Sequence, residues 1–242
     1  YKRQNQKPNE TRLDLVQKNA KIMADVVTQI KEQEYKGILL IVSNPVDIMT
    51  QVAMEVSGFP EHRVFGSGTV LDSARLRYHL GQHLGVDSRS VHAFVIGEHG
   101  DSEIAAWSSA NVSGVPLNSF CEMRGHYNHE GNTESIEEQV KNSAYEIIAK
   151  KDATYYGIAM VVKRICQAIV RDEKSIFPIS LRMHGEYALE DVVLSMPAIV
   201  GARGIETTIP ISLDEKEVSR LHESAEMLRE TCLLYTSPSP RD

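Results

Sequence analysis

The chain has 242 residues, enough for one large domain or two smaller ones. Its composition, 42% hydrophobic and 24% charged, is typical of a globular protein, and its net charge of -7 argues against a nucleic-acid partner. Apolar runs such as "GILLIV" are too short to cross a bilayer, so we expect no membrane partner either. The cysteines number 3 and lack metal-site spacing, which favours the reducing cytoplasm.

The first third of the chain has a helix-strand-helix pattern. Apolar residues recur at spacings of three and four over residues 13–30, which predicts an amphipathic helix. The continuous apolar run "ILLIV" at 38–42 predicts a strand buried on both faces, as in a parallel sheet covered by helices. A helix is predicted over 47–56 and a short strand over 63–66. This order is typical of half of a doubly wound, Rossmann-type sheet.

The glycine pattern of the other half of such a sheet is not found. No G-x-G-x-x-G follows a strand, and no earlier strand is predicted that would carry one. We therefore expect a fragment whose first βαβ half is missing, and we expect this chain by itself to be inactive.

The two ends resemble cloning or sequencing remnants. The codons TGTCTCTTATAC encode "CLLY", and their reverse complement overlaps TATAAGAGACAG, which encodes "YKRQ". This complementarity is similar to a transposase adapter read at both ends of a gene fragment. We expect residues 1–4 and 232–242 to be non-native, and exclude them from predictions of the fold.

The remainder predicts a mixed α/β domain. An apolar-rich helix within 67–85 is expected to be sandwiched, and the strand "SVHAFVIG" at 90–97 leads into "EHGD". After a variable stretch at 124–135, helices are predicted over 136–150 and 155–170. Residues 179–213 read as a run of short strands. Asp214 and Glu217 form a capping box for a last helix.

Reduction of a 2-keto acid needs a small set of side chains. Arginine binds a carboxylate with two parallel hydrogen bonds, and a cation must stabilise the charge that develops on the ketone oxygen. Histidine supplies a proton near neutral pH, and an aspartate fixes its tautomer. The candidates are Arg12, Asp72, Arg75 and His99. Asp72 and Arg75 lie three positions apart on one predicted helix, a spacing that an ordinary surface ion pair also has.

Five motifs place this pattern in a family. The stretches "QKPNETRLDLV", "IVSNPVD", "GSGTVLDSARLR", "GEHGDSE" and "KKDATYYGIA" occur in the order and spacing of the NAD-dependent lactate and malate dehydrogenases. The resemblance is greatest to the bacterial L-lactate dehydrogenases and runs from about residue 5 to residue 231. It implies that residues 5–66 form the second half of a dinucleotide-binding domain and that residues 67–231 form the substrate domain.

The resemblance also implies roles for single residues. His99 would be the proton donor and acceptor, Asp72 its partner, and Arg12 the group that polarises the ketone. Substrate would further contact Gln6, Asn44, Arg75 and Thr154. The nicotinamide end of NAD would contact Val42, Asn44 and Ser67. Arg77 and His92 match positions where relatives bind fructose 1,6-bisphosphate, and a homotetramer is expected. The resemblance implies no metal site.

Gln6 separates the two main alternatives. Malate dehydrogenases have an arginine at this position to bind a second carboxylate, whereas a neutral glutamine favours pyruvate and lactate. A malate or other 2-hydroxy-acid dehydrogenase remains the first alternative. A non-catalytic protein on the same fold is the second, although it would have no need of Arg12, Asp72, Arg75 and His99 together.

Overall fold

The computed structural model describes residues 12–151 and 155–236. Its helices are α1 (Arg12–Glu32), α2 (Val46–Ser57), α3 (Val70–Leu84), α4 (Leu117–Met123), α5 (His129–Lys151), α6 (Tyr156–Val170) and α7 (Glu215–Thr236), with short 3-10 turns between some of them. Its strands are β1 (Leu39–Ile41), β2 (Val64–Gly66), β3 (Val91–His92), β4 (Val95–Ile96), β5 (Ile104–Ala105), β6 (Asn111–Val112), β7 (Val115–Pro116), β8 (Ser175–His184), β9 (Glu190–Gly201) and β10 (Gly204–Thr208).

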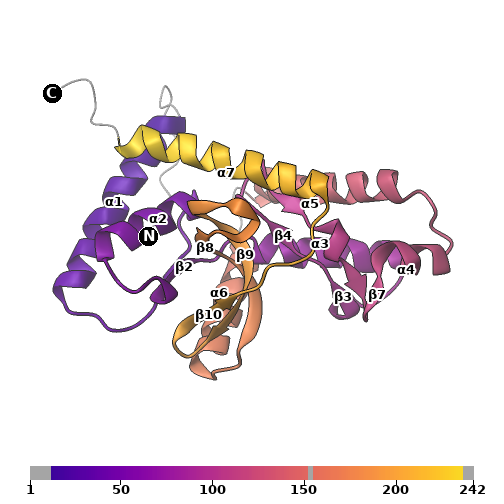
Figure 1. Ribbon diagram of the computed structural model, residues 1–242, viewed down its shortest axis with the longest axis horizontal. Coiled ribbons are helices and arrows are strands. Elements are labelled where there is room, and N and C mark those ends of the chain that lie inside the picture. Colours follow the sequence, from indigo (N-terminus) through magenta and orange to yellow (C-terminus); the bar gives the residue numbers. More distant parts are fainter. Residues whose placement is uncertain (1–11, 152–154, 237–242) are drawn as a thin grey trace.

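A five-stranded sheet in the order β1-β2-β8-β9-β10 forms the centre of the molecule (Figure 1). β1 and β2 are parallel, which confirms the expected half of a doubly wound sheet. The remaining pairs are antiparallel, so the sheet is mixed. The prediction of several short strands over 179–213 is wrong about the length of the strands. β8 has 10 residues and β9 has 12, because the two pair with each other along nearly their whole length.

The two parts of the sheet meet at one residue pair, Gly66 of β2 and Ser180 of β8. A Cβ atom on Gly66 would lie 2.5 Å from Thr50 Oγ1 and 2.8 Å from Ser180 Oγ. Glycine is therefore required here because β2 approaches both α2 and β8 more closely than a side chain allows.

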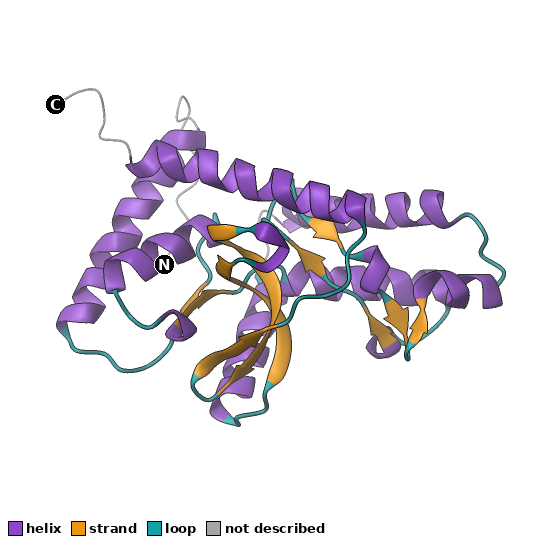
Figure 2. Ribbon diagram, viewed as in Figure 1, coloured by secondary structure: helices purple, strands orange, loops and turns teal. Residues whose placement is uncertain are grey.

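Helices cover both sides of this sheet. α2 and α7 pack against β9, and α1 packs against α2, while α6 lies on the rear side of β8–β10 as viewed in Figure 2. The interior is apolar, and its fully buried members include Phe65, Met49, Ile165 and Leu194. The predicted capping box is confirmed, since the backbone N–H of Glu217 donates to Asp214 Oδ1 at 2.8 Å and that of Asp214 donates to Glu217 Oε2 at 2.9 Å.

A second, smaller core lies between α3 and α5. It includes Leu76, Leu80, Val91, Val112 and Val140. The predicted strand 90–97 is wrong as a single element: it divides into β3, which pairs with β6, and β4, which pairs with β5. α5 begins at His129, seven residues before the start that was predicted at residue 136. α3 contacts α5, α6, β3 and β4, which confirms that it is sandwiched.

α7 continues to Thr236, beyond the expected native boundary at residue 231. Cys232 lies against the main core, and its Sγ donates to Gln51 Oε1 at 3.2 Å. The expectation that residues 232–242 are non-native stays a prediction, because a helix can propagate through any residues that tolerate its geometry. No described helix combines the length and apolar character that a membrane span requires.

Candidate active site

His99, Asp72 and Arg75 lie together in the folded chain. His99 Nδ1 is 2.7 Å from Asp72 Oδ2, and Arg75 Nη1 donates to Asp72 Oδ1 at 3.0 Å. The Asp72 side chain is 4% exposed, whereas that of His99 is 28% exposed. The aspartate is thus enclosed, and the imidazole it holds still reaches solvent. This is the arrangement that the sequence predicted for a proton-transferring histidine and its partner.

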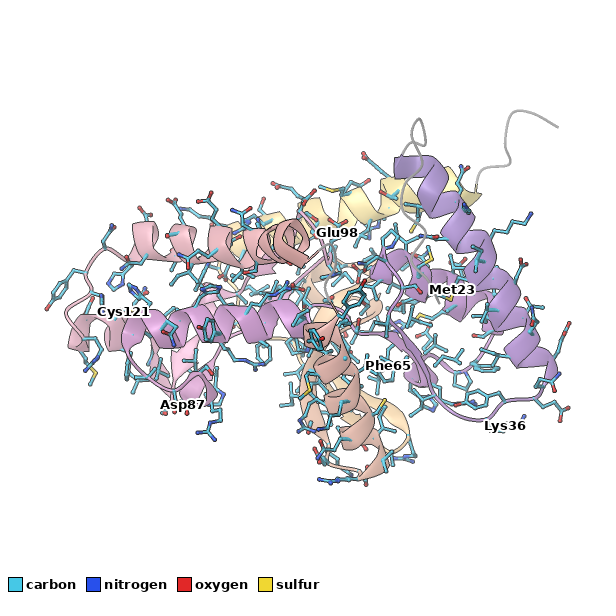
Figure 3. All side chains as sticks on the ribbon, turned by 180° about the vertical axis from the view of Figure 1, so that it is seen from behind. Met23, Lys36, Phe65, Asp87, Glu98 and Cys121 are labelled. Atoms are coloured by element: carbon cyan, nitrogen blue, oxygen red, sulfur yellow. The ribbon has the colours of Figure 1, made fainter. Side chains whose placement is uncertain are left out.

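The turn after β4 delivers His99 to this position. Gly97 exchanges two backbone hydrogen bonds with Ser195 of β9, at 2.9 and 2.8 Å, and has a φ of +83°. The next backbone N–H, of Glu98, donates to Ser224 Oγ of α7 at 2.9 Å. Figure 3 places Glu98 in the middle of the molecule, between the Met23 and Lys36 end and the Asp87 and Cys121 end. His99 therefore starts from a backbone that neighbouring elements hold on both sides.

The electrostatics favour a charged pair. Burial alone lowers the pKa of His99, but the hydrogen bond and charge of Asp72 outweigh it and raise this pKa to about 9. Burial likewise raises the pKa of Asp72, and the contacts with His99 and Arg75 outweigh it and hold this pKa below its usual range. At neutral pH the site therefore contains a His99 imidazolium against an ionised Asp72 carboxylate.

The proposed nicotinamide contacts meet at the carboxyl ends of two parallel strands. Val42 and Asn44 follow β1, and Ser67 follows β2, whose register places Ile41 opposite Gly66. The Ser67 N–H donates to the Ile41 carbonyl at 2.8 Å, which closes this end of the pair. Val42 is 36% exposed, and Asn44 is exposed as well. An open α/β sheet binds ligands at this edge, so Val42 and Asn44 are accessible to the nicotinamide end of a dinucleotide, whereas Ser67 is 4% exposed.

Sequence reasoning missed a second aspartate that contacts His99. Asp47 of α2 is 1% exposed, and its Oδ2 accepts the backbone N–H of His99 at 2.8 Å. Its Oδ1 accepts the Ser180 hydroxyl at 2.5 Å. Asp47 belongs to the motif "SNPVD", in which the sequence analysis gave a role only to Asn44, so this motif could have indicated Asp47. Ser180 lies 133 positions farther along the chain, and no motif indicated it.

Glu103 is a second residue near His99 for which the sequence predicted no role. It is 6% exposed, and its carboxylate, the Asp72 carboxylate and a His99 ring nitrogen lie within 4.8 Å of one another. Burial, followed by the charge of Asp72, raises the pKa of Glu103 to about 8. Glu103 is therefore neutral at pH 7, and the carboxyl-rich site carries less negative charge than its sequence implies.

The remaining predicted residues are placed as follows. Arg77 lies on α3, half-buried, and burial lowers its pKa. His92 is exposed on β3. Gln6 and Thr154 lie outside the described residues. Arg12 begins α1, but its side chain is also outside the described part.

Two family profiles match this chain. Residues 3–66 match the NAD binding domain of the lactate/malate dehydrogenases, and residues 69–234 match their alpha/beta C-terminal domain. The chain belongs to the lactate/malate dehydrogenase family. It is thus a member of a family of NAD-dependent oxidoreductases, and the predicted fold class, enzyme class and cofactor are confirmed.

Individual proteins similar to this chain are L-lactate dehydrogenases. The chain is 48% identical over 226 residues to an L-lactate dehydrogenase of Acetivibrio thermocellus, a match that covers 93% of this chain and 71% of that protein. It is 48% identical over 223 residues to an L-lactate dehydrogenase of Thermoanaerobacterium saccharolyticum, covering 92% of this chain and 72% of the relative.

Solved structures give the same result. The minor L-lactate dehydrogenase of Enterococcus mundtii, in a ligand-bound form, superposes with a TM-score of 0.91 at 42% identity, over 98% of this chain and 74% of that one. A lactate dehydrogenase from a Medee basin deep-sea metagenome library superposes with a TM-score of 0.93 at 44% identity, over 97% and 74% of the two chains.

Proposed function

We propose that the protein is an NAD-dependent L-lactate dehydrogenase, which reduces pyruvate to L-lactate and catalyses the reverse reaction. The observation that carries this proposal is the hydrogen-bonded set of His99, Asp72 and Arg75 in a chain 48% identical to L-lactate dehydrogenases. NADH, when bound, supplies the hydride. The other tasks fall to side chains of the protein.

His99 transfers the proton. In pyruvate reduction its imidazolium donates the Nε2 proton to the ketone oxygen as negative charge develops there, and in lactate oxidation its neutral ring accepts the hydroxyl proton. Asp72 keeps the proton on Nδ1 and stabilises the imidazolium. The pKa of about 9 keeps His99 protonated at neutral pH, which favours the direction of pyruvate reduction.

Substrate is held by the remaining candidates. We assign the pyruvate carboxylate to Arg75, whose side chain is 15% exposed beside Asp72, and further substrate contacts to Thr154 and Asn44. Arg12 would polarise the ketone, and Gln6 would face the methyl group. Val42, Asn44 and Ser67 would contact the nicotinamide end of NAD.

We also propose regulation by fructose 1,6-bisphosphate at Arg77 and His92. Within the described residues no hydrogen bond or ion pair to the Arg77 guanidinium is found, although this side chain is half-buried. A half-buried cation without a protein partner is suited to an anionic ligand. His92 is exposed, and its ring N–H would be a second hydrogen-bond donor to the same ligand.

Assembly and location complete the proposal. α6 exposes large apolar side chains, including Tyr156 at 80%, Met160 at 60% and Val170 at 84%, which supports burial of this face in a homotetramer. The three cysteines carry free thiols, as suits the cytoplasm, where the enzyme would serve pyruvate fermentation after glycolysis.

The test compares pyruvate with oxaloacetate. Kinetics are measured on a chimera in which residues 5–231 are joined to the part of the Acetivibrio thermocellus relative that this chain does not match. We expect kcat/KM for pyruvate to exceed that for oxaloacetate, because Gln6 offers no cation to a second carboxylate and burying it unpaired is costly. The opposite order would replace lactate with malate as the substrate.

A further inference from the structure

Two carboxylates from two different helices hold the same histidine. Asp72 of α3 holds the His99 ring at Nδ1, 2.7 Å away, and Asp47 of α2 holds the His99 backbone N–H, 2.8 Å away. The ring contact alone does not fix a side chain in space, because the ring moves with its backbone. A second contact on the backbone amide removes that freedom.

The Asp47 carboxylate is itself fixed. Its second oxygen accepts the hydroxyl of Ser180, which is 0% exposed on β8. Asp47 therefore joins three segments that are far apart in sequence: the first turn of α2, the turn after β4 and the middle of β8. Both of its oxygens are occupied, so the carboxylate has little freedom to rotate.

Such a residue is costly for the fold alone. A buried charge loses its hydration, and an uncharged or apolar side chain of similar volume is often at least as stabilising. Burial raises the pKa of Asp47 to about 6, against the opposing effects of the Ser180 and His99 hydrogen bonds, so this carboxylate is ionised at neutral pH. A charge retained in this position points to a use other than stability.

We propose that Asp47 is a positioning residue, which, held by Ser180, fixes the backbone of His99 and stabilises the imidazolium through its negative charge. This inference rests on the proposed function, because it assigns to Asp47 a part in the same proton transfer. The groups that face His99 are then Asp72 from α3, Asp47 from α2 and Glu103 from the segment before β5. Their charges, with that of Asp72 the largest, all act to raise the His99 pKa.

The first experiment measures the His99 pKa by NMR titration of the imidazole in the 242-residue chain. Asp47→Asn removes the charge but keeps an oxygen that accepts the His99 N–H. We expect the His99 pKa to fall by about one unit, the low end of the effect of an opposite charge nearby. Asp25→Asn, the same substitution on the exposed side of α1, is the matched control and should leave this pKa unchanged. An unchanged His99 pKa in Asp47→Asn would overturn the proposal.

A second variant tests the anchor without removing the charge. Ser180→Ala deletes the hydroxyl that holds Asp47 Oδ1, and we expect the His99 backbone amide to exchange with solvent at least about threefold faster, since its acceptor is less constrained. If Asp47→Asn does not fold, the amide exchange of Ser180→Ala alone tests whether Asp47 positions His99. Wild-type exchange at His99 in a folded Ser180→Ala would then count against the anchor and the proposal with it.

The kinetic readout separates this inference from the proposed function. In the chimera, Asp47→Asn should lower kcat for pyruvate about tenfold, a loss of about 1.4 kcal/mol in transition-state stabilisation, with KM little changed because Arg75 is untouched. If the unmutated chimera fails to reduce pyruvate, the proposed function fails, whereas the NMR titration still decides the role of Asp47. An unchanged kcat in Asp47→Asn overturns the inference and leaves the proposed function standing.

Discussion

His99 Nδ1 lies 2.7 Å from Asp72 Oδ2, and this pair links the stability of the fold to its protonation. Contact with Asp72 raises the His99 pKa from 6.5 to about 9 despite the opposing effect of burial. The folded chain therefore holds this proton over a pH range in which the unfolded chain releases it. The same contact that would prepare His99 for its proposed proton transfer also stabilises the protein below pH 9.

The first prediction is the pH dependence that follows. Because the folded pKa of His99 lies above its unfolded value, its contribution is fully present below pH 6.5 and is lost as pH rises through about 9. The loss should be on the order of 3 kcal/mol in the free energy of unfolding. Urea titrations at several pH values measure it. His99→Asn should remove this part of the pH dependence, and an equally steep decline in that variant would contradict the assignment.

The second prediction has the opposite sign and concerns Asp47. The folded pKa of about 6 lies above the unfolded value of 3.8, so stability falls as pH rises through this window. Above pH 6 the ionised carboxylate costs on the order of 3 kcal/mol. Asp47→Asn should accordingly melt at a higher temperature than the wild type at pH 8 and lose this advantage near pH 4. A lower melting temperature at pH 8 would mean that the charge stabilises the fold.

A third prediction concerns Glu103. Glutamine is a close match to the neutral carboxyl that Glu103 presents below its pKa of about 8. Glu103→Gln should therefore leave the protonation of His99 and the pyruvate kinetics close to the wild type at pH 7. At pH 9 the wild type gains a negative charge that the variant lacks, so the variant should release the His99 proton at lower pH. Rates measured at both pH values test this, and a large loss at pH 7 would show that Glu103 is ionised there.

The fourth prediction is a reversal of substrate preference. In the chimera, Gln6→Arg should favour oxaloacetate, which gains a charge-assisted partner, while pyruvate leaves a buried guanidinium unpaired. The change should appear in kcat/KM for the two substrates. His99→Ala is the matched contrast, because it should lower the turnover of both substrates without changing their order. Retention of pyruvate preference in Gln6→Arg would remove residue 6 from the specificity site.

The fifth prediction concerns the effector. If Arg77 and His92 bind fructose 1,6-bisphosphate, the bisphosphate should activate dilute chimeric enzyme, because it binds the active assembly more tightly than the inactive one. His92→Gln should weaken this activation and leave activity without effector intact. Identical pyruvate kinetics with and without the bisphosphate at slightly acidic pH would refute the regulatory site.

Much of the fold follows from local patterns. The period of apolar residues over 13–30 predicts α1 to within two residues at each end, because this helix buries one face, as Val16 and Val27 show. The apolar pattern does not predict strand boundaries that depend on which strands pair with each other. Residues 90–97 read as one strand, but β3 and β4 pair with different neighbours and the chain bends between them. The length of β8 and β9 likewise depends on their mutual pairing.

The residues of the candidate site likewise include some that the sequence predicted and some that it did not. His99, Asp72 and Arg75 were predicted from motif and spacing, and the fold brings them into contact. Asp47 and Ser180 were not, because hydrogen bonds between α2 and β8 leave no mark on local sequence. The neutral state of Glu103 also depends on burial, which an acidic residue next to "GEHGDS" does not reveal.

The close approach at Gly66 has a consequence for which sequences can encode an active enzyme. A methyl group there would meet Ser180 Oγ at 2.8 Å, and that hydroxyl is the one that anchors Asp47. Alanine at position 66 would therefore disturb the position of His99 through Ser180 and Asp47, although residue 66 itself bonds to neither His99 nor Asp72. Selection for catalysis, and not only for folding, is thus expected to keep this position free of a side chain.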